Sequence, residues 1–213
     1  MNGIENNSRI PIPTVKRLPS YLRLLLNAQN QGSRFISATT LAAELDLKPI
    51  QVRKDISSTG IEGRPKIGFE IAGLIKRITA VLGWDTPTEA LIIGAGNLGS
   101  ALAAYNGFDA YRLRITAIFD KDPDKRGMVI NNLSVMPMEE LAAYIKQHSV
   151  TVAVIAVPAL QAQPLADLLV KLGIKGIWNF APGELKVPEN VVVQRTDLAT
   201  AFAVLSVRMR ERA

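Results

Sequence analysis

The chain has 213 residues, 48% of them hydrophobic and none of them cysteine, so it can form one or two domains with real cores but no disulfide, thiolate nucleophile or cysteine-based zinc site. No apolar run approaches the roughly 18 residues of a membrane span, and the start lacks a signal peptide, so we expect a cytoplasmic protein that makes no membrane contact. The formal net charge is +6, and residues 1–85 carry 12 Lys and Arg against 7 Asp and Glu, which indicates a polyanionic partner, nucleic acid before membrane.

Three short helices are predicted in the first 60 residues. The first covers residues 20–30, the second begins with Thr39 or Thr40 as its cap, and the third covers residues 49–60. Their order is typical of a helix-turn-helix, whose last helix enters the major groove; a helical interaction module is the alternative. The outward face of the third helix is polar and basic. From it and the turn before it, the predicted DNA-binding residues are Lys48, Gln51, Arg53, Lys54, Ser57 and Ser58.

The next segment, "IEGRPKIGFEI", combines glycines, a proline, two cations and apolar positions, as a β-hairpin wing would. Such a wing places Arg64 and Lys66 near phosphates or a narrow minor groove. A linking helix, "AGLIKRITAVLG", and a boundary at "WDTPTE" follow. We therefore predict a winged helix-turn-helix domain over residues 1–85.

The rest of the chain alternates strand and helix patterns. Strands are expected at "EALIIG", "RITAIFD", "TVAVIAVP", "GIKGIWNF" and "NVVVQR", and helices are expected to begin near Asn97, Met138 and Gln161. Short, continuous apolar runs are typical of parallel strands buried on both faces. We predict an α/β fold whose second domain, residues 86–197, is a Rossmann-type doubly wound parallel sheet. Residues 198–213 form an amphipathic helix with a basic end.

A dinucleotide site is predicted where the first of these strands meets its helix. Gly94, Gly96 and Gly99 form G-x-G-x-x-G, which allows a tight turn, close approach of a pyrophosphate and close helix packing. Asp120 ends the second strand, 21 residues after Gly99, and can accept hydrogen bonds from the adenosine ribose. NAD is favoured over NADP, although Lys121 leaves a mixed preference open. Coenzyme A binding and a vestigial site are the alternatives.

No catalytic constellation accompanies this site. The single histidine, His148, stands at a helix end, where a solvated role is typical. Tyr105, Tyr111, Tyr144 and the lysines are further candidates, but none of them belongs to a recognisable catalytic constellation. We predict no catalytic residue and no metal site, so the nucleotide is expected to be sensed rather than turned over. An NAD-dependent dehydrogenase or reductase with a helical N-terminal appendage is the alternative.

Motifs along nearly the whole chain resemble those of the Rex redox-sensing transcriptional repressors. They are "RLPSYLRLL", "QVRKDIS", "GAGNLGSAL", "IFDKDP", "IAVP", "GIKGIWNFAP" and "TDL". The resemblance implies a homodimer that binds an inverted-repeat operator in double-stranded DNA, senses NADH and NAD⁺, and releases DNA when NADH binds. It also implies that the last helix is exchanged between subunits for dimerisation.

The resemblance assigns roles to individual positions. The pyrophosphate would be held by Gly94, Ala95, Gly96, Asn97, Leu98 and Gly99. Asp120 and Lys121 would contact the adenosine side. The nicotinamide end would be lined by Val157, Pro158, Asn179, Phe180 and Ala181. Arg23, Tyr105 and Asp197 would form a switch in which the aspartate exchanges partners between redox states.

The chain departs from the family at three places. "SSTG" stands where members usually carry an aromatic pair, and "GRPKIGF" replaces a glycine-flanked arginine followed by a tyrosine. Pro65 fixes φ and removes a donor, so we expect an altered wing and an altered operator preference. Leu198 stands where some members have phenylalanine, which would weaken stacking on the nicotinamide.

Overall fold

A computed structural model describes residues 10–211 of the chain. Its contacts divide the chain into two units, one ending at Thr86 and the other beginning at Pro87, and each unit is described here by itself. No helix within residues 10–211 is both long enough and apolar enough to cross a membrane.

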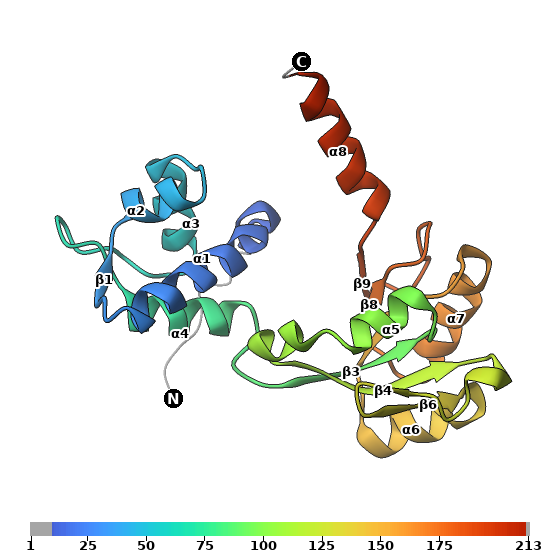
Figure 1. Ribbon diagram of the computed structural model, residues 1–213. Coiled ribbons are helices and arrows are strands. Elements are labelled where there is room, and N and C mark those ends of the chain that lie inside the picture. The colour runs from blue at the N-terminus through green and yellow to red at the C-terminus, as the bar shows by residue number, and fades with distance from the viewer. Residues whose placement is uncertain (1–9, 212–213) are drawn as a thin grey trace. The chain divides into compact units, whose positions relative to one another are not determined.

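The first unit is a small helical bundle with a two-stranded sheet (Figure 1). Its elements are α1 (Ile12–Asn30), β1 (Phe35–Ile36), α2 (Ala38–Glu44), α3 (Pro49–Ser58), β2 (Phe69–Glu70) and α4 (Ile71–Val81). One core joins the four helices, and its fully buried side chains include Leu18, Leu41, Ile56 and Leu74. The predicted helix-turn-helix is confirmed, with α3 as its third helix.

Two helix starts differ from the sequence prediction. The first helix begins at Ile12 rather than at Ser20, because Pro13 lies in the first turn, where the missing N–H removes no hydrogen bond, and Pro19 is tolerated inside the helix. The second helix is capped by Ser37 rather than by Thr39 or Thr40, since the Ser37 hydroxyl accepts a 2.9 Å hydrogen bond from the Thr40 N–H.

The wing is not the self-contained hairpin expected from residues 61–71. Strand β2 pairs antiparallel with β1, so its partner comes from the segment before α2. The wing itself closes by a single bridge, in which the backbone groups of Arg64 and Gly68 exchange hydrogen bonds of 2.8 and 2.9 Å. Lys66 lies at its tip with φ +60°, a left-handed conformation that costs free energy in any residue but glycine.

The second unit is a seven-stranded sheet in the order β5-β6-β4-β3-β7-β8-β9. Its strands are β3 (Thr88–Ile93), β4 (Leu113–Asp120), β5 (Val129–Ile130), β6 (Leu133–Pro137), β7 (Val152–Ile155), β8 (Gly176–Asn179) and β9 (Val192–Arg195). All pairs are parallel except β5 with β6. From β6 to β9 the order is that of a Rossmann sheet, which confirms the predicted fold class.

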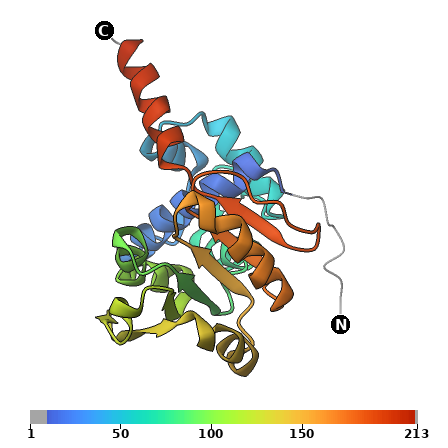
Figure 2. The ribbon, with the colours of Figure 1, turned by 90° about the vertical axis from the view of Figure 1, so that its right-hand side faces the viewer.

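Helices cover both faces of this sheet (Figure 1). They are α5 (Asn97–Ala103), α6 (Leu141–His148) and α7 (Ala159–Lys171), with short 3₁₀ turns at Asn106–Tyr111, Pro123–Lys125 and Met138–Glu140. One core packs α6 and α7 against the sheet, and Figure 2 shows α7 in orange along the later strands. A second core packs α5 against the opposite face. Helix α7 begins at Ala159, directly after its N-cap residue Pro158 and two residues before the expected start near Gln161.

The hairpin β5–β6 was not predicted from the sequence. Its loop consists of Asn131 and Asn132, which both have positive φ, the conformation that a two-residue hairpin turn requires. The Asn-Asn pair between "MVI" and "LSV" is the signal that indicates it.

The chain ends in α8 (Leu198–Arg210), none of whose residues is buried. Its exposed apolar side chains include Leu198, Phe202, Leu205 and Met209, spaced three and four residues apart. The helix therefore presents an apolar stripe that the described chain does not cover.

Candidate nucleotide and nucleic-acid sites

The glycine loop between β3 and α5 contains two glycines that close packing requires and one glycine that faces open space. A Cβ on Gly94 would lie 2.4 Å from the Ala156 carbonyl oxygen, and one on Gly99 would lie 1.8 Å from the Gly94 carbonyl oxygen. A Cβ on Gly96 would have no atom within 4 Å. Folding therefore explains the first and third glycines, whereas the second leaves room for a ligand to approach the backbone.

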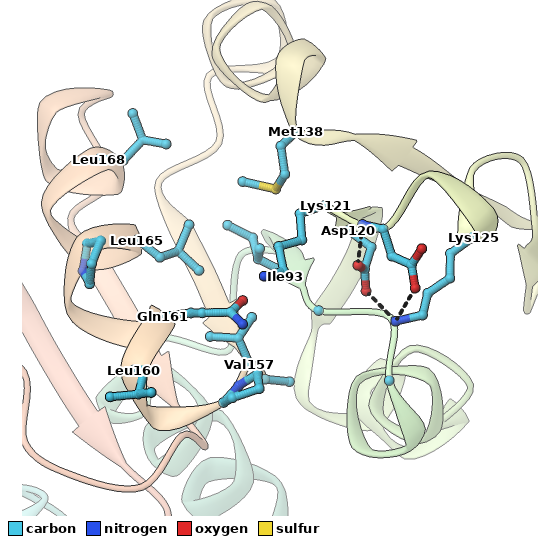
Figure 3. Close-up of a pocket in the computed structure, with 16 residues that line it drawn as sticks. Ile93, Asp120, Lys121, Lys125, Met138, Val157, Leu160, Gln161, Leu165 and Leu168 are labelled. Carbon is cyan, nitrogen blue, oxygen red and sulfur yellow. Dashed lines mark hydrogen bonds and ion pairs between the residues drawn. The ribbon is translucent and has the colours of Figure 1, made fainter.

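A pocket of about 610 Å³ opens beside this loop, at the carboxyl ends of the parallel strands (Figure 3). Ligands bind at this edge of doubly wound sheets, and the volume lies within the usual range for small-molecule sites. The lining residues are Ile93, Gly94, Gly96, Asp120, Lys121, Asp122, Lys125, Met138, Ala156, Val157, Pro158, Leu160, Gln161, Pro164, Leu165 and Leu168. Of the residues predicted from sequence, the pocket brings together Gly94, Gly96, Asp120, Lys121, Val157 and Pro158.

Asp120 is the buried carboxylate of the pocket. One oxygen accepts hydrogen bonds from the Ala95 N–H at 2.7 Å and the Lys125 ammonium at 3.0 Å, and the other accepts from the Asp122 N–H at 2.9 Å. Burial raises the pKa of Asp120, but these donors outweigh it and hold the pKa below its ordinary value. The group is therefore ionised at neutral pH, and it fixes the glycine loop through its direct hydrogen bond from the Ala95 N–H.

The opposite wall of the pocket is apolar and was missed from the sequence. Leu165 and Leu168 project from α7 on the side opposite Met138, and Leu160 lies at the start of the same helix, near Val157 (Figure 3). Leu160 is 93% exposed, which is unusual for a leucine on a helix that packs on a sheet. The sequence of α7 carries leucines on more than one face of the helix, and this pattern could have indicated that one face lines a pocket.

The remaining predicted cofactor residues lie outside the pocket lining. Asn97 and Leu98 are exposed at the start of α5, and Ala95 is buried with its N–H bound to Asp120. Asn179 is fully buried: its side-chain oxygen accepts from the Ala181 N–H at 3.0 Å, and its amide donates to the Gly183 carbonyl at 3.3 Å. It shapes the loop after β8, in which Phe180 and Ala181 lie.

The predicted switch residues are divided between the two units. Arg23 is exposed on α1 in the first unit, while Tyr105 and Asp197 belong to the second. Asp197 caps α8 by accepting from the Ala199 N–H at 2.9 Å, and its other oxygen forms a 2.5 Å ion pair with Arg195. Arg195 is therefore a partner of Asp197 that was not expected from the sequence.

On the first unit, α3 presents a cationic face. Arg53, Lys54 and Ser57 are exposed, as is Lys48 in the turn before the helix. Gln51 differs, because its amide donates a 3.0 Å hydrogen bond to Asp55. Ser58 is half-buried, and its hydroxyl donates to the Asp55 carbonyl oxygen.

Asp55 is a buried acceptor that sequence reasoning missed. Its carboxylate accepts from Thr14 at 2.9 Å, from Arg17 at 2.6 and 2.7 Å, and from Tyr21 at 2.7 Å. Burial raises the pKa of Asp55, but the hydrogen bonds, that from Arg17 foremost, lower it to about 2. Asp55 therefore fixes α3, the expected recognition helix, to α1, although its partners on α1 lie 34 to 41 residues earlier in the sequence.

A groove of about 440 Å³ separates the wing from α3 and the start of α2. Three cations line it, Arg53 from the helix and Arg64 and Lys66 from the wing, and no carboxylate does. The Arg64 guanidinium lies over the Phe35 ring, 5.6 Å from its centroid. The groove thus has the positive charge that attracts a phosphate backbone.

Comparison with known proteins relates both units to characterised families. A family model described as a putative DNA-binding protein N-terminus matches residues 9–57, and one described as a CoA binding domain matches residues 85–183. A redox-sensing transcriptional repressor Rex from Treponema denticola is 45% identical over 200 residues, which cover 94% of this chain and 95% of that protein. The protein of the same name from Carboxydothermus hydrogenoformans is 38% identical over 95% of this chain and 97% of its own length.

Crystal structures of RSP, a Rex-family repressor, have the same fold. The complex of RSP with β-NAD⁺ and operator DNA matches with a TM-score of 0.89 at 32% identity, covering 97% of this chain and 95% of that one. The complex of RSP with β-NADH matches with a TM-score of 0.85 at 32% identity, covering 97% of each chain.

Proposed function

The chain belongs to the Rex family of redox-sensing transcriptional repressors, and on this premise we propose which of its residues bind DNA, bind the nicotinamide cofactor and connect the two events. It is a repressor and not an enzyme, and NADH and NAD⁺ are ligands that it senses. We propose that it acts as a cytoplasmic homodimer on an inverted-repeat operator.

The open space at Gly96 is the observation that carries the cofactor assignment. No neighbouring protein atom would clash with a side chain at this position, so packing does not require a glycine there. A pyrophosphate that lies on the free N–H groups at the start of α5 does require one, because a side chain would block its approach. Asp120 and Lys121 serve the adenosine ribose, and Val157 and Pro158 lie where the dinucleotide continues towards the nicotinamide. Asn179 acts indirectly, by holding the Phe180–Ala181 loop.

DNA binding is assigned to the groove between α3 and the wing. Arg53, Arg64 and Lys66 supply the positive charge of the groove, and Ser57 also lines it. Lys54 on α3 and Lys48 just before it are exposed outside the groove lining, and we assign them to further phosphate contacts. Because Gln51 is held by Asp55, we assign it to fixing the recognition helix rather than to reading bases. Ser58 has the same assignment, since its hydroxyl is bound to its own helix.

Dimerisation is assigned to α8, exchanged with a second copy of the chain. The uncovered apolar stripe along this helix supports the assignment, because an isolated amphipathic helix gains little stability without a surface to pack on. A symmetric dimer also presents two recognition helices to the two halves of an inverted repeat.

Differential binding is the mechanism, since a ligand shifts an equilibrium only as far as its affinities for the two states differ. The reduced nicotinamide is uncharged and suits an apolar, closed site better than the cationic oxidised ring does, because burying an unpaired charge is costly. NADH therefore favours closure, and closure moves the recognition helices away from the spacing of about 34 Å between successive major-groove faces. We propose that Asp197, at the base of α8, exchanges its ion pair with Arg195 for a contact with Tyr105 or Arg23 as the dimer closes.

Gly96→Ala tests the assignment. The added methyl meets no protein atom, so we expect the melting temperature to be unchanged. Because it would crowd the pyrophosphate instead, about tenfold more NADH should be needed to release a labelled operator duplex, which corresponds to about 1.4 kcal/mol of binding free energy. Anisotropy of the duplex during titration with NADH measures this, with coenzyme A as the control ligand. Release at the wild-type NADH concentration would contradict the site, and release by coenzyme A would contradict its ligand.

A further inference from the structure

Trp178 joins three segments of the second unit. Its ring lies 5.8 Å from that of Phe108 and 5.0 Å from that of Phe180, and Phe108 in turn lies edge-on to Tyr105 at 4.9 Å. Its indole N–H donates a 2.8 Å hydrogen bond to the Thr196 hydroxyl. Aromatic rings in such tilted and edge-on arrangements attract one another beyond their burial, so these contacts restrain the segments mutually.

The first of these segments is linked to the cofactor pocket. Phe180 follows β8, and its N–H donates a 2.9 Å hydrogen bond to the carbonyl oxygen of Ile155. Ala156 and Val157, the next residues along the chain, line the pocket. One main-chain hydrogen bond therefore connects Phe180 to the strand end that leads directly into the pocket wall.

Another segment is the base of α8. Thr196 immediately precedes Asp197, the residue that caps this helix. Thr196 is held twice, by the Trp178 indole at its side chain and by the Asn179 carbonyl oxygen at its N–H, 2.9 Å away. Strand β8 thus holds the residue from which α8 departs, and it does so with the strand end that carries Phe180.

The third segment is the turn that carries Tyr105. Its ring packs on Gly107 so closely that a Cβ there would lie 2.3 Å from the ring. Tyr105 reaches Trp178 through the intervening ring of Phe108. Trp178 is the side chain that contacts the Phe180 loop, the Tyr105 turn and the base of α8 within one packed group.

We propose that Trp178 is a positioning residue that couples occupancy of the cofactor pocket to the base of α8. Trp178 is not among the residues that line the pocket, so its substitution is expected to change the response to NADH rather than the binding of either ligand alone. The inference rests on the proposed function, because a change at the base of α8 can alter operator binding only if α8 governs how the dimer binds DNA. Thr196 is the receiving residue, and its hydroxyl is the contact that carries the coupling.

Two conservative variants break this contact from its two sides. Trp178→Phe keeps an aromatic ring but removes the N–H donor, and Thr196→Val keeps the shape but removes the acceptor. Thr196→Ser is the matched control, since it retains the hydroxyl. The quantity to measure is the ratio of operator dissociation constants with and without saturating NADH, together with the NADH dissociation constant and the melting temperature of each variant.

We expect NADH affinity and operator affinity without NADH to stay within about twofold of wild type in both variants, while the ratio falls about fivefold, the size of one lost hydrogen bond. Thr196→Ser should keep the wild-type ratio, and the double variant should resemble the single ones because both remove one interaction. An unchanged ratio in Trp178→Phe and in Thr196→Val would overturn the proposal. A wild-type ratio of one would instead overturn the proposed function.

Discussion

Each unit contains a buried aspartate that accepts several hydrogen bonds, and the two differ in where their donors come from. All of the Asp55 carboxylate's donors are side chains, three of them on α1 and one on its own helix. Asp120 accepts from two backbone N–H groups in loops and from one lysine in the 3₁₀ turn that follows β4. Asp55 therefore fixes one helix to another, whereas Asp120 shapes a loop around a ligand.

The largest expected effect is a loss of stability when the charge of Asp55 is removed. Asp55→Asn leaves Arg17 partly buried without its counter-ion, and we expect the N-terminal unit to lose about 3 kcal/mol of unfolding free energy, as for other broken buried pairs. Operator binding should be lost while NADH binding persists. Urea unfolding followed by Trp84 emission in a Trp178→Phe background reports on this unit, since Trp84 packs on its core.

Asp46→Asn, at an exposed position, is the matched control and should behave as wild type. Equal unfolding free energies for the two variants would show that Asp55 does not hold the recognition helix.

Acid should remove the stabilising effect of Asp55 from the first unit. The folded pKa of Asp55 is about 2, below its ordinary 3.8, so its stabilising effect is present above pH 4 and is lost as the pH falls towards 2. The shift corresponds to about 2 kcal/mol. We expect the free energy of unfolding of the first unit, again followed by Trp84, to fall across this window. If the slope is the same in Asp55→Asn, another group is responsible.

Asp120→Ala should have its main effect on binding. The pocket loses a ribose acceptor and the anchor of the Ala95 N–H, so we expect about a tenfold loss of NADH affinity, in the range of one charged hydrogen bond. Calorimetric titration measures it, and Asp124→Ala, an exposed neighbour outside the pocket lining, is the control. Wild-type NADH affinity in Asp120→Ala would remove this residue from the site.

The smallest expected effects are on operator affinity, and they distinguish Lys54 from Gln51 on α3. Lys54→Ala should weaken operator binding about fivefold and reduce the salt dependence by about 0.9, the value for one phosphate contact. Gln51→Ala should change affinity by less than twofold, because its amide serves Asp55 instead of DNA. Gel-shift titrations at several salt concentrations compare them. A loss in Gln51→Ala that equals the loss in Lys54→Ala would return Gln51 to the DNA interface.

The same contrast explains how much the sequence could predict. The glycine loop and Asp120 were predictable because their chemistry belongs to the backbone and to a fixed spacing after a strand. The role of Asp55 was not, because its partners Thr14, Arg17 and Tyr21 lie on another helix that meets it only in the folded unit. The apolar wall on α7 was hidden for a similar reason, since core leucines and pocket leucines look alike in a helical pattern.

The wing shows a further limit. Composition indicated a turn with two cations, and Arg64 and Lys66 do line a groove with Arg53. The pairing of β2 with β1 depends on a contact between segments more than 30 residues apart, which no local pattern encodes. Local signals therefore predicted the turn and missed the strand that supports it.

The central claim, that the bound nucleotide is a signal read by the DNA-binding unit, is tested most directly by linkage. NADH affinity is measured by calorimetry with and without a saturating operator duplex, and the same is done for NAD⁺. Because coupling between two ligands is reciprocal, operator DNA should weaken NADH binding by the factor by which NADH weakens operator binding, and it should not weaken NAD⁺ binding. Equal NADH affinities with and without operator would contradict the account.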